Sequence, residues 1–429
     1  MSGSIALSFT TLLSASVLSL SGLLAGPPTS AAAGGPEPGA HAPVGEPALT
    51  IGRCADRLGT SSLVTDDDGT STALWGCAHH IYAARTRADG TWQRAVDLGV
   101  GLEPKAVVDQ RNRVTVLYRG LQGNGIESRR WAGDAWQRAV DLTWKTDADR
   151  VFVQWYSIAS NARGDTIAVW TQNDGEVQSG PRPWMVAAYR PFDGAWTTTV
   201  RVAKGSSSDG SLVDGSGRVV TLPGLFRRTT AGVWRHPATP AMEGAYGGAA
   251  VNSLGDLLMT RRPEPGADAV LVYEKPFGEA WLPGVQVGTT PSYLGQIRAV
   301  LEDSGRAVVS YAAGGSARTA TRAAGGAWAA PVEVSAAHVQ ASVVRLVRGP
   351  SGALALSWLQ GPDFTKRQLW LSIQQAGGDW SAPVKVTGAT WQHVDHTTVS
   401  FRSDSAVVVA WTGHRTDKPG WWFASRVVS

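Results

Sequence analysis

The heptapeptide Trp-Gln-Arg-Ala-Val-Asp-Leu occurs twice, at Trp92–Leu98 and at Trp136–Leu142, 44 residues apart. Looser copies share the form W-x3-V-x-[LV] and recur at similar intervals along the chain. A segment that repeats about every 45 residues is typical of a repeat architecture, in which each unit packs on its neighbours. The looser copies begin at Trp196, Trp281, Trp328 and Trp380, and Trp234 marks a degenerate one.

A second element precedes each copy and has the form [DNE]-x-x-G-x5-[WY]. Examples run from Asp66 to Trp75, from Asn161 to Trp170 and from Glu302 to Tyr311. A short polar side chain followed by Gly at the left-handed position is a hairpin turn. The apolar residues after the Gly indicate a buried strand.

One unit therefore contains four strands, expected at residues 106–109, 114–118, 126–130 and 139–142 in the second copy. Four antiparallel strands per repeat of this length are typical of a β-propeller blade. The alternative is an array of β-sandwiches, which do not usually repeat one Trp hairpin so regularly. The sequence predicts an all-β propeller of eight blades, with seven as the alternative because the unit around Val219–Trp234 is weak.

The two ends of the repeat region predict how the ring closes. The last unit has strands at residues 397–401, 406–411 and 422–426, and a fourth strand is missing. Residues 47–52 form a short strand that has no blade of its own. We expect this N-terminal strand to complete the last blade, since that would remove an exposed sheet edge.

The N-terminal segment indicates export. Residues 11–26 form an apolar core of signal-peptide length, Ala31–Ala33 supplies small residues for cleavage, and no charged residue precedes Glu37. The sequence therefore predicts a signal peptide over residues 1–33, a flexible linker over 34–46 and a single propeller domain over 47–429, in a secreted, extracellular protein. In an oxidising compartment the two cysteines, Cys54 and Cys77, are expected to form a disulfide.

Charge excludes one large class of partner. The chain has a formal net charge of +4, and its 39 basic residues are scattered rather than gathered in a run. Nucleic-acid binding is therefore not expected. The partners that the sequence favours are a glycan or an extracellular protein, bound by a monomer with no membrane-spanning segment after signal cleavage.

The turn before each repeated Trp resembles the Asp-box of sialidase-like (BNR-repeat) propellers. The copies that carry this resemblance are Asp89-Gly90-Thr91-Trp92, Asp193-Gly194-Ala195-Trp196 and Gly378-Asp379-Trp380. The leading Ser of that motif is absent and the spacing is shorter. No Arg-Ile-Pro segment that would anchor a sialidase arginine triad lies near the first blade. The resemblance therefore implies the propeller fold and not the sialidase activity.

In a propeller of this topology, the loops before the inner strands lie on one face, and here they vary in length and composition. Variable loops on a rigid scaffold often carry the function. Side chains at the mouth of the inner strands would line a central funnel, a usual position for a ligand. The candidate ligand-binding residues are Glu103, Trp155, Tyr156, Asp209, Tyr246, Arg298 and His396.

Histidines gather near the expected seam between the first and last blades. Histidine together with a carboxylate is able to bind a divalent metal, the one cofactor that the sequence suggests; solvent-facing loop residues are the alternative. The candidate metal ligands are His79, His80, His393, Asp395, His396 and His414.

The repeated aromatic residues are interpreted as packing between blades. A basic residue also lies six positions before the Trp in several units, as at Arg130, Arg190, Arg228, Lys275 and Arg322. These cations either cover an aromatic ring or pair across a hairpin, or else form a repeated sugar site with the Trp.

No catalytic motif accompanies the repeats, so catalytic residues are not assigned. We interpret the chain as a secreted non-catalytic propeller that binds a ligand, with carbohydrate on the variable-loop face as the favoured class. The alternative is a sialidase-like glycoside hydrolase or a polysaccharide lyase, whose first candidate carboxylates are Asp147, Asp149, Asp209 and Asp395.

Overall fold

The structure is a computed structural model. All described residues belong to the second of the two units into which the chain divides, Met1–Ala40 and His41–Ser429. The predicted signal peptide and linker, and the candidates Asp147 and Asp149, lie outside them. The described residues are 48–55, 59–121, 125–144, 151–174, 183–204, 208–223, 225–236, 245–262, 268–290, 297–336, 340–363 and 365–429.

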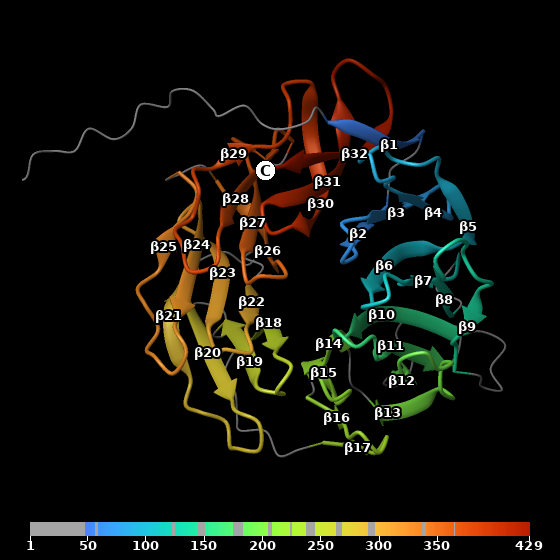
Figure 1. The fold of residues 1–429 in the computed structure, drawn as a ribbon, viewed down its shortest axis with the longest axis vertical. Helices are drawn as coiled ribbons and strands as arrows, with labels where there is room; N and C mark the ends of the chain where they lie inside the picture. Colours follow the sequence, from blue (N-terminus) through green and yellow to red (C-terminus); the bar gives the residue numbers. More distant parts are fainter. Residues whose placement is uncertain are drawn as a thin grey trace, which may run out of the picture. The chain divides into compact units, whose positions relative to one another are not determined.

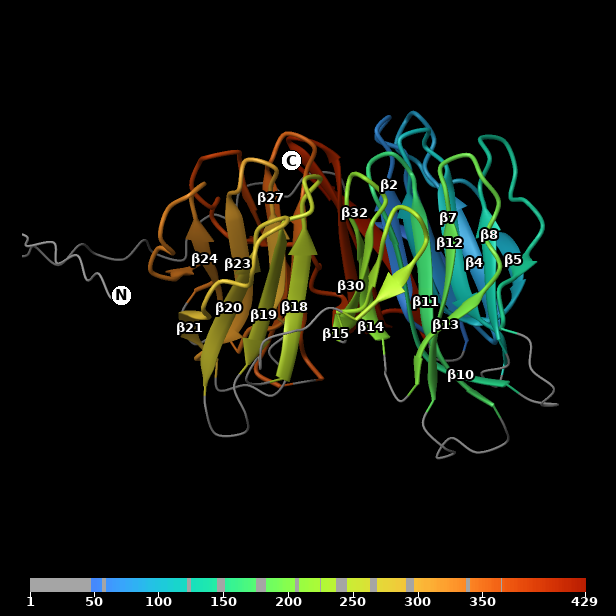
Figure 2. The same cartoon turned by 90° about the horizontal axis from the view of Figure 1, so that it is seen from below.

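Eight four-stranded antiparallel sheets follow one another around a ring, which confirms the eight-bladed propeller (Figure 1). Figure 2 shows the same sheets from the side, with strands running between the two edges at which the connecting turns lie. The first four blades are β2–β5 (Ser61–Thr65, Ser71–Cys77, His80–Arg85, Val96–Val100), β6–β9 (Leu102–Val108, Val114–Arg119, Ile126–Arg130, Val140–Asp141), β10–β13 (Val151–Ser160, Thr166–Asp174, Trp184–Arg190, Val200–Lys204) and β14–β17 (Ser208–Val213, Val219–Pro223, Arg227–Arg228, Trp234–Arg235).

The weak unit around Val219–Trp234 is thus a real fourth blade, although its two outer strands span two residues each. The remaining blades are β18–β21 (Ala245–Val251, Leu257–Arg262, Ala269–Lys275, Val285–Thr289), β22–β25 (Arg298–Leu301, Ala307–Ala313, Ser316–Arg322, Val332–Glu333), β26–β29 (Ser342–Arg348, Leu354–Gln360, Gln368–Gln374, Val384–Lys385), and β30, β31 and β32 (Trp391–Ser403, Ala406–Arg415, Trp421–Val428) with β1 (Leu49–Cys54).

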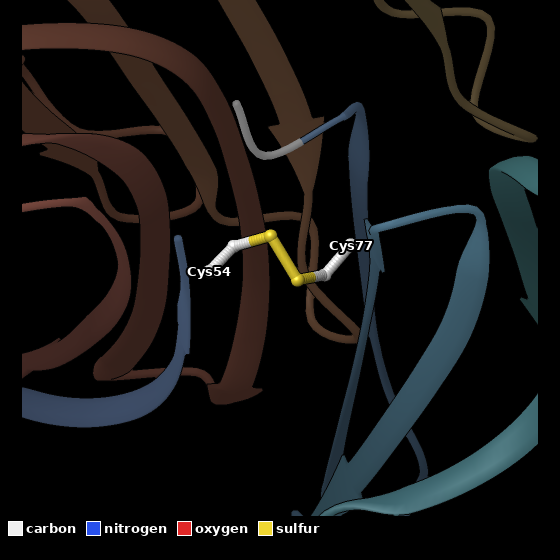
Figure 3. Close-up of a disulfide and its surroundings, with 2 residues drawn as sticks. All are labelled: Cys54 and Cys77. Atoms are coloured by element: carbon white, nitrogen blue, oxygen red, sulfur yellow. A yellow bond between two sulfur atoms is a disulfide. The ribbon is translucent and has the colours of Figure 1, made fainter. Parts of the chain in front are cut away.

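The eighth blade closes the ring in the predicted way. Strand β1 pairs antiparallel with β32, with Thr50 opposite Ala424 and Cys54 opposite Trp421. Inner strand β30 contacts β2 of the first blade, and each inner strand contacts the inner strand of the next blade. The predicted disulfide is confirmed, since Cys54 on β1 is bonded to Cys77 on β3 (Figure 3). It joins the last blade to the first.

The hydrophobic core is divided among the blade junctions. Within the described part of the chain, buried apolar side chains form eight clusters, one at each junction. The aromatic residue of the second strand lies at the centre of most of them. Trp75, for example, packs on Phe423 of the last blade at 5.3 Å between ring centroids. A Cβ on Gly52 would lie 2.6 Å from the Trp75 ring, so this close contact requires glycine. The aromatics are therefore inter-blade packing residues, as the sequence indicated.

Some of the repeated Trp residues of the outer hairpins form a polar contact between blades. The indole N–H donates to the third strand of the preceding blade in three cases. Trp92 donates to Ser425 Oγ at 2.8 Å, Trp328 to Glu274 Oε1 at 3.1 Å and Trp380 to Thr319 Oγ1 at 3.1 Å. The bond from Trp92 reaches from the first blade to the last, so the repeat itself takes part in closure.

Candidate functional site

Six inner strands carry an irregularity of the same kind near their first residues. The register with the second strand shifts between Leu102 and Lys105 in β6, between Val153 and Tyr156 in β10, and between Ser208 and Gly210 in β14. Equivalent shifts occur in β18, β26 and β30. A β-bulge turns a side chain away from its regular direction, and bulges are frequent beside binding sites.

Most of the sequence candidates lie in or beside these bulges. Glu103, Trp155, Asp209 and His396 fall inside the shifted segments, and Glu103 has a φ of 55°. Tyr156 and Tyr246 flank them, and Arg298 opens β22. The candidates therefore occupy equivalent ends of the inner strands. For Asp209 and Tyr246 the structure describes only this backbone position.

The structure brings two of these candidates, Glu103 and Tyr156, together between blades 2 and 3. Glu103 pairs with Arg119 at 3.0 Å, and Arg119 also donates to Val153 O at 3.3 Å. The hydroxyl of Tyr156 donates to the carbonyls of Leu102 and Glu103. Tyr156 is buried, which raises the pKa of its phenol well above 10, so its hydroxyl anchors the bulge. Trp155 is 60% exposed.

The predicted metal ligands do not converge. No group of three or more histidine, cysteine or acidic side chains suited to a metal occurs among the described residues. His80 bonds Asp97 at 2.8 Å, and the His414 ring lies 4.0 Å from the Trp421 ring. His396 lies 3.7 Å from Asp395. The seam between blades 1 and 8 does bring their strands together, but the imidazoles turn to local partners. His79 follows β3 with a φ of 68°, and the ring of His393 lies 6.2 Å from that of Trp421.

Three cavities lined by described residues lie between the outer strands of neighbouring blades. We name them crevice 6/7, of about 400 Å³, crevice 3/4, of about 270 Å³, and crevice 8/1, of about 10 Å³, after the blades that form them. Each is lined by the repeated Trp of one blade and by the third strand of the blade before it. Representative lining residues are Thr319, Glu333, Gln374, Asp379 and Trp380 in crevice 6/7, Tyr189, Thr197, Arg228 and Trp234 in crevice 3/4, and Leu49, Trp92, Arg402 and Ser425 in crevice 8/1.

Crevice 6/7 combines one partly exposed aromatic ring with several polar groups. Trp380 is half-buried, and its bond to Thr319 fixes the ring against blade 6. Glu333 accepts hydrogen bonds from Ser316 Oγ at 2.8 Å and from Arg318 at 3.3 Å. Asp379 is exposed beside the indole. Such a set offers a flat apolar surface together with fixed hydrogen-bond acceptors.

The basic residues before the Trp mostly have structural partners. Arg130 pairs with Asp109 at 3.2 Å, Arg322 pairs with Glu274 at 2.9 Å, and the guanidinium of Arg228 lies 3.8 Å from the centre of the Tyr189 ring. Arg228 therefore covers an aromatic ring, as one alternative predicted, whereas Arg130 pairs with a carboxylate of the inner turn and Arg322 with a carboxylate of the preceding blade. Arg228 also lines crevice 3/4, so one of them is available to a ligand.

Sequence reasoning missed the crevices because it placed the site on the variable-loop face. They lie along the outer strands, next to the uniform hairpins. The signal that pointed toward them was the recurrence of Trp at one position of every unit. In the described residues, no helix is long and apolar enough to cross a membrane.

No family model and no curated protein matches this sequence. Solved structures resemble it in fold. The BP39L lectin from Burkholderia pseudomallei matches with a TM-score of 0.52 and 12% identity, over 79% of this chain and 100% of the lectin. An Aleuria aurantia lectin mutant in complex with Fucα1-6GlcNAc has a TM-score of 0.43 and 12% identity, over 77% and 97%. A streptogramin B lyase has a TM-score of 0.44 and 10% identity, over 70% and 90%.

At these identities the likeness shows the β-propeller fold alone. The fold does not by itself choose a function. The sialidase-like resemblance stays at the level of the fold, because no sialidase family is identified from the sequence.

Proposed function

We propose that this chain is a non-catalytic, extracellular carbohydrate-binding propeller whose ligands occupy the crevices between blades. The observation that carries the proposal is crevice 6/7, where Trp380 stands beside Glu333, Asp379 and Gln374 in about 400 Å³. That volume is in the range of small-molecule sites, which pair an apolar surface with a few fixed polar groups. One face of a pyranose ring presents C–H groups that stack on an indole, while its hydroxyls bond carboxylates and amides.

Further features support the proposal. Crevice 3/4 repeats the arrangement with Trp234, Tyr189 and Arg228, so one chain would bind two sugars and gain avidity on a multivalent glycan. The disulfide is consistent with an extracellular protein, and the predicted signal peptide points the same way. A lectin is among the solved structures of similar fold.

Glycoside hydrolysis is the second candidate, since crevice 6/7 contains two carboxylates. Glu333 is already bonded to Ser316 and to Arg318. A carboxylate held in this way is suited to accept hydrogen bonds from a ligand rather than to donate a proton. A panel of fluorogenic glycosides decides the matter, because turnover at nanomolar protein would overturn the binding proposal.

Replacing Trp380 by Ala is expected to weaken glycan binding about fivefold or more, since an aromatic stacking partner contributes about 1 kcal/mol or more. A glycan array identifies the ligand, and titration calorimetry of the purified variants measures the loss. Trp92→Ala is the matched control, because it removes the equivalent indole at crevice 8/1, which has room for about 10 Å³ only. We expect Trp92→Ala to leave glycan affinity unchanged.

The Trp155→Ala variant distinguishes a ligand in the crevices from a ligand at the mouth of the inner strands, where the sequence placed the candidate residues. Trp155 is 60% exposed on inner strand β10 and is not among the lining residues of either large crevice. We expect its removal to change affinity less than twofold. If Trp155→Ala abolishes binding while Trp380→Ala does not, the ligand occupies the mouth and the crevice proposal is wrong.

A further inference from the structure

In every blade, one residue of the inner strand pairs with the residue just before the aromatic position of the second strand. These eight inner-strand residues form one level of the ring, and all of them are small, hydroxyl-bearing or cationic. No carboxylate occurs among these eight positions, whereas three of them are cations. The positions in blades 1 to 8 are Ser62, Lys105, Ser157, Gly210, Gly248, Arg298, Arg345 and Thr398.

Side chains at this level reach the following blade. Ser62 Oγ accepts the Ala106 N–H of blade 2 at 3.2 Å, and Ser157 Oγ bonds Ser211 Oγ of blade 4 at 3.0 Å. Lys105 Nζ donates to Tyr156 O of blade 3. The same geometry would direct Arg298 at blade 7 and Arg345 at blade 8. The two arginines lie on consecutive inner strands, β22 and β26, and these strands contact each other (Figure 1).

Among the described residues, no hydrogen-bond or ion-pair partner meets the guanidinium of Arg345, and the charge that acts on it is that of Arg298. Burial, together with repulsion from Arg298, lowers the pKa of Arg345 to about 10, so it stays charged at neutral pH. Placing an uncompensated charge in a partly buried position costs free energy unless a partner joins it.

Two buried hydroxyls lie at the same level. Ser310 lies opposite Arg298 and Ser357 lies opposite Arg345, and neither Oγ atom has a hydrogen-bond partner among the residues that the structure describes. Directly opposed residues of an antiparallel pair share one face of the sheet. Each arginine therefore has an unused hydroxyl donor beside it. Buried polar groups ordinarily have a hydrogen-bond partner, so an acceptor is expected for both serine hydroxyls.

We propose that the inner strands of blades 6 and 7 bind an oxyanion, a sulfate, phosphate or carboxylate group, between the guanidiniums of Arg345 and Arg298. The planar fork of a guanidinium matches two oxygens of such a group, and the serine hydroxyls supply further donors. The anion would neutralise the uncompensated positive charge of Arg345. This site is separate from the crevices, so it stands whether or not they bind sugars.

The test measures thermal unfolding while sodium sulfate, phosphate or acetate is added at constant ionic strength, with sodium chloride as reference. We expect at least one oxyanion to raise the midpoint in a saturable way, as preferential binding to the folded state requires. Arg345→Gln and Arg298→Gln are each expected to weaken the fitted affinity at least about tenfold, the effect of losing one charge-assisted pair. The ranking of the three anions identifies the group.

Arg348→Gln is the matched control, because Arg348 is exposed on the same strand and its removal changes net charge equally. It should leave the affinity unchanged. Equal losses in Arg345→Gln and Arg348→Gln, or no saturable shift with any of the three anions, would overturn the proposal. Should Arg345→Gln fail to fold, Arg345→Lys keeps the charge but loses the fork, and a several-fold weaker affinity is expected. Glycan binding should be unaffected by each variant, which separates this site from the crevices.

Discussion

A chain shortened to begin at Gly59, and so lacking β1, is expected to lose cooperative unfolding or to aggregate. Strand β1 supplies the fourth strand of blade 8, and its removal exposes the edge of β32 from Trp421 to Ser425. Phe423 and Trp75, which are buried against each other, lose the cover of Gly52. Since stability is ordinarily about 5–15 kcal/mol, losing a whole strand at the seam removes much of it. Exposed strand edges also promote association.

The control for this truncation keeps β1 and removes only the cross-link. Cys54→Ser with Cys77→Ser opens a bond between residues 23 apart in sequence, and the expected loss is about 3 kcal/mol. Urea unfolding followed by tryptophan fluorescence, together with light scattering, measures both proteins. An unchanged midpoint in the truncated chain would show that blade 8 is stable with three strands, contrary to the proposed role of β1 in closure.

The blade count and the closure were predictable because each depends on local chemistry that repeats. A polar residue followed by Gly favours a turn in every unit. For this reason even the weak unit at Val219–Trp234 could be counted as a blade. Closure followed from counting strands at the two ends. Strand bounds were less exact, since the inner strand expected at residues 397–401 extends over Trp391–Ser403. Most of the additional residues, 391–396, lie before or within a bulge between Val394 and Thr397, and the bulged positions of the inner strands share no residue type.

The candidate site was less predictable because it depends on contacts between units. Trp92 and Trp380 stand in the same repeat position, yet their crevices differ from about 10 to about 400 Å³. At crevice 8/1, Arg402 and Leu49 line the space beside Trp92. Those two residues lie more than 350 positions apart in sequence. No periodicity in a single unit encodes such a difference.

The predicted metal site of histidines at the seam between blades 1 and 8 also depended on contacts that the sequence does not encode. The sequence placed His80 and His414 at one seam, and the seam exists. The direction of each ring, however, is decided by a neighbour on its own blade, Asp97 for His80 and Trp421 for His414. Proximity of strands was thus predictable, while convergence of side chains was not.

Asp109→Ala is expected to destabilise the fold by about 3–5 kcal/mol, the cost of removing one partner from a buried ion pair. The carboxylate of Asp109 is 3% exposed and pairs with Arg113 at 2.8 Å and with Arg130 at 3.2 Å. It also interacts with Arg190 of the next blade, whose pKa burial and repulsion from Arg130 lower to about 10. Without Asp109, three guanidiniums would share one region with no buried carboxylate among them.

Asp214→Ala is the matched control, because Asp214 holds the equivalent turn in blade 4 but pairs with the single arginine Arg218, which is 27% exposed. Its expected cost is about 1–2 kcal/mol, mainly from the lost hydrogen bonds to the turn. Arg190→Met added to Asp109→Ala should recover part of the loss, since it removes one of the uncompensated charges. Urea denaturation of the unaltered protein, Asp109→Ala, Arg190→Met and the double variant completes a double-mutant cycle. Equal costs at Asp109 and Asp214 would mean that the turn bonds, and not the arginine cluster between blades 2 and 3, set the stability of this junction.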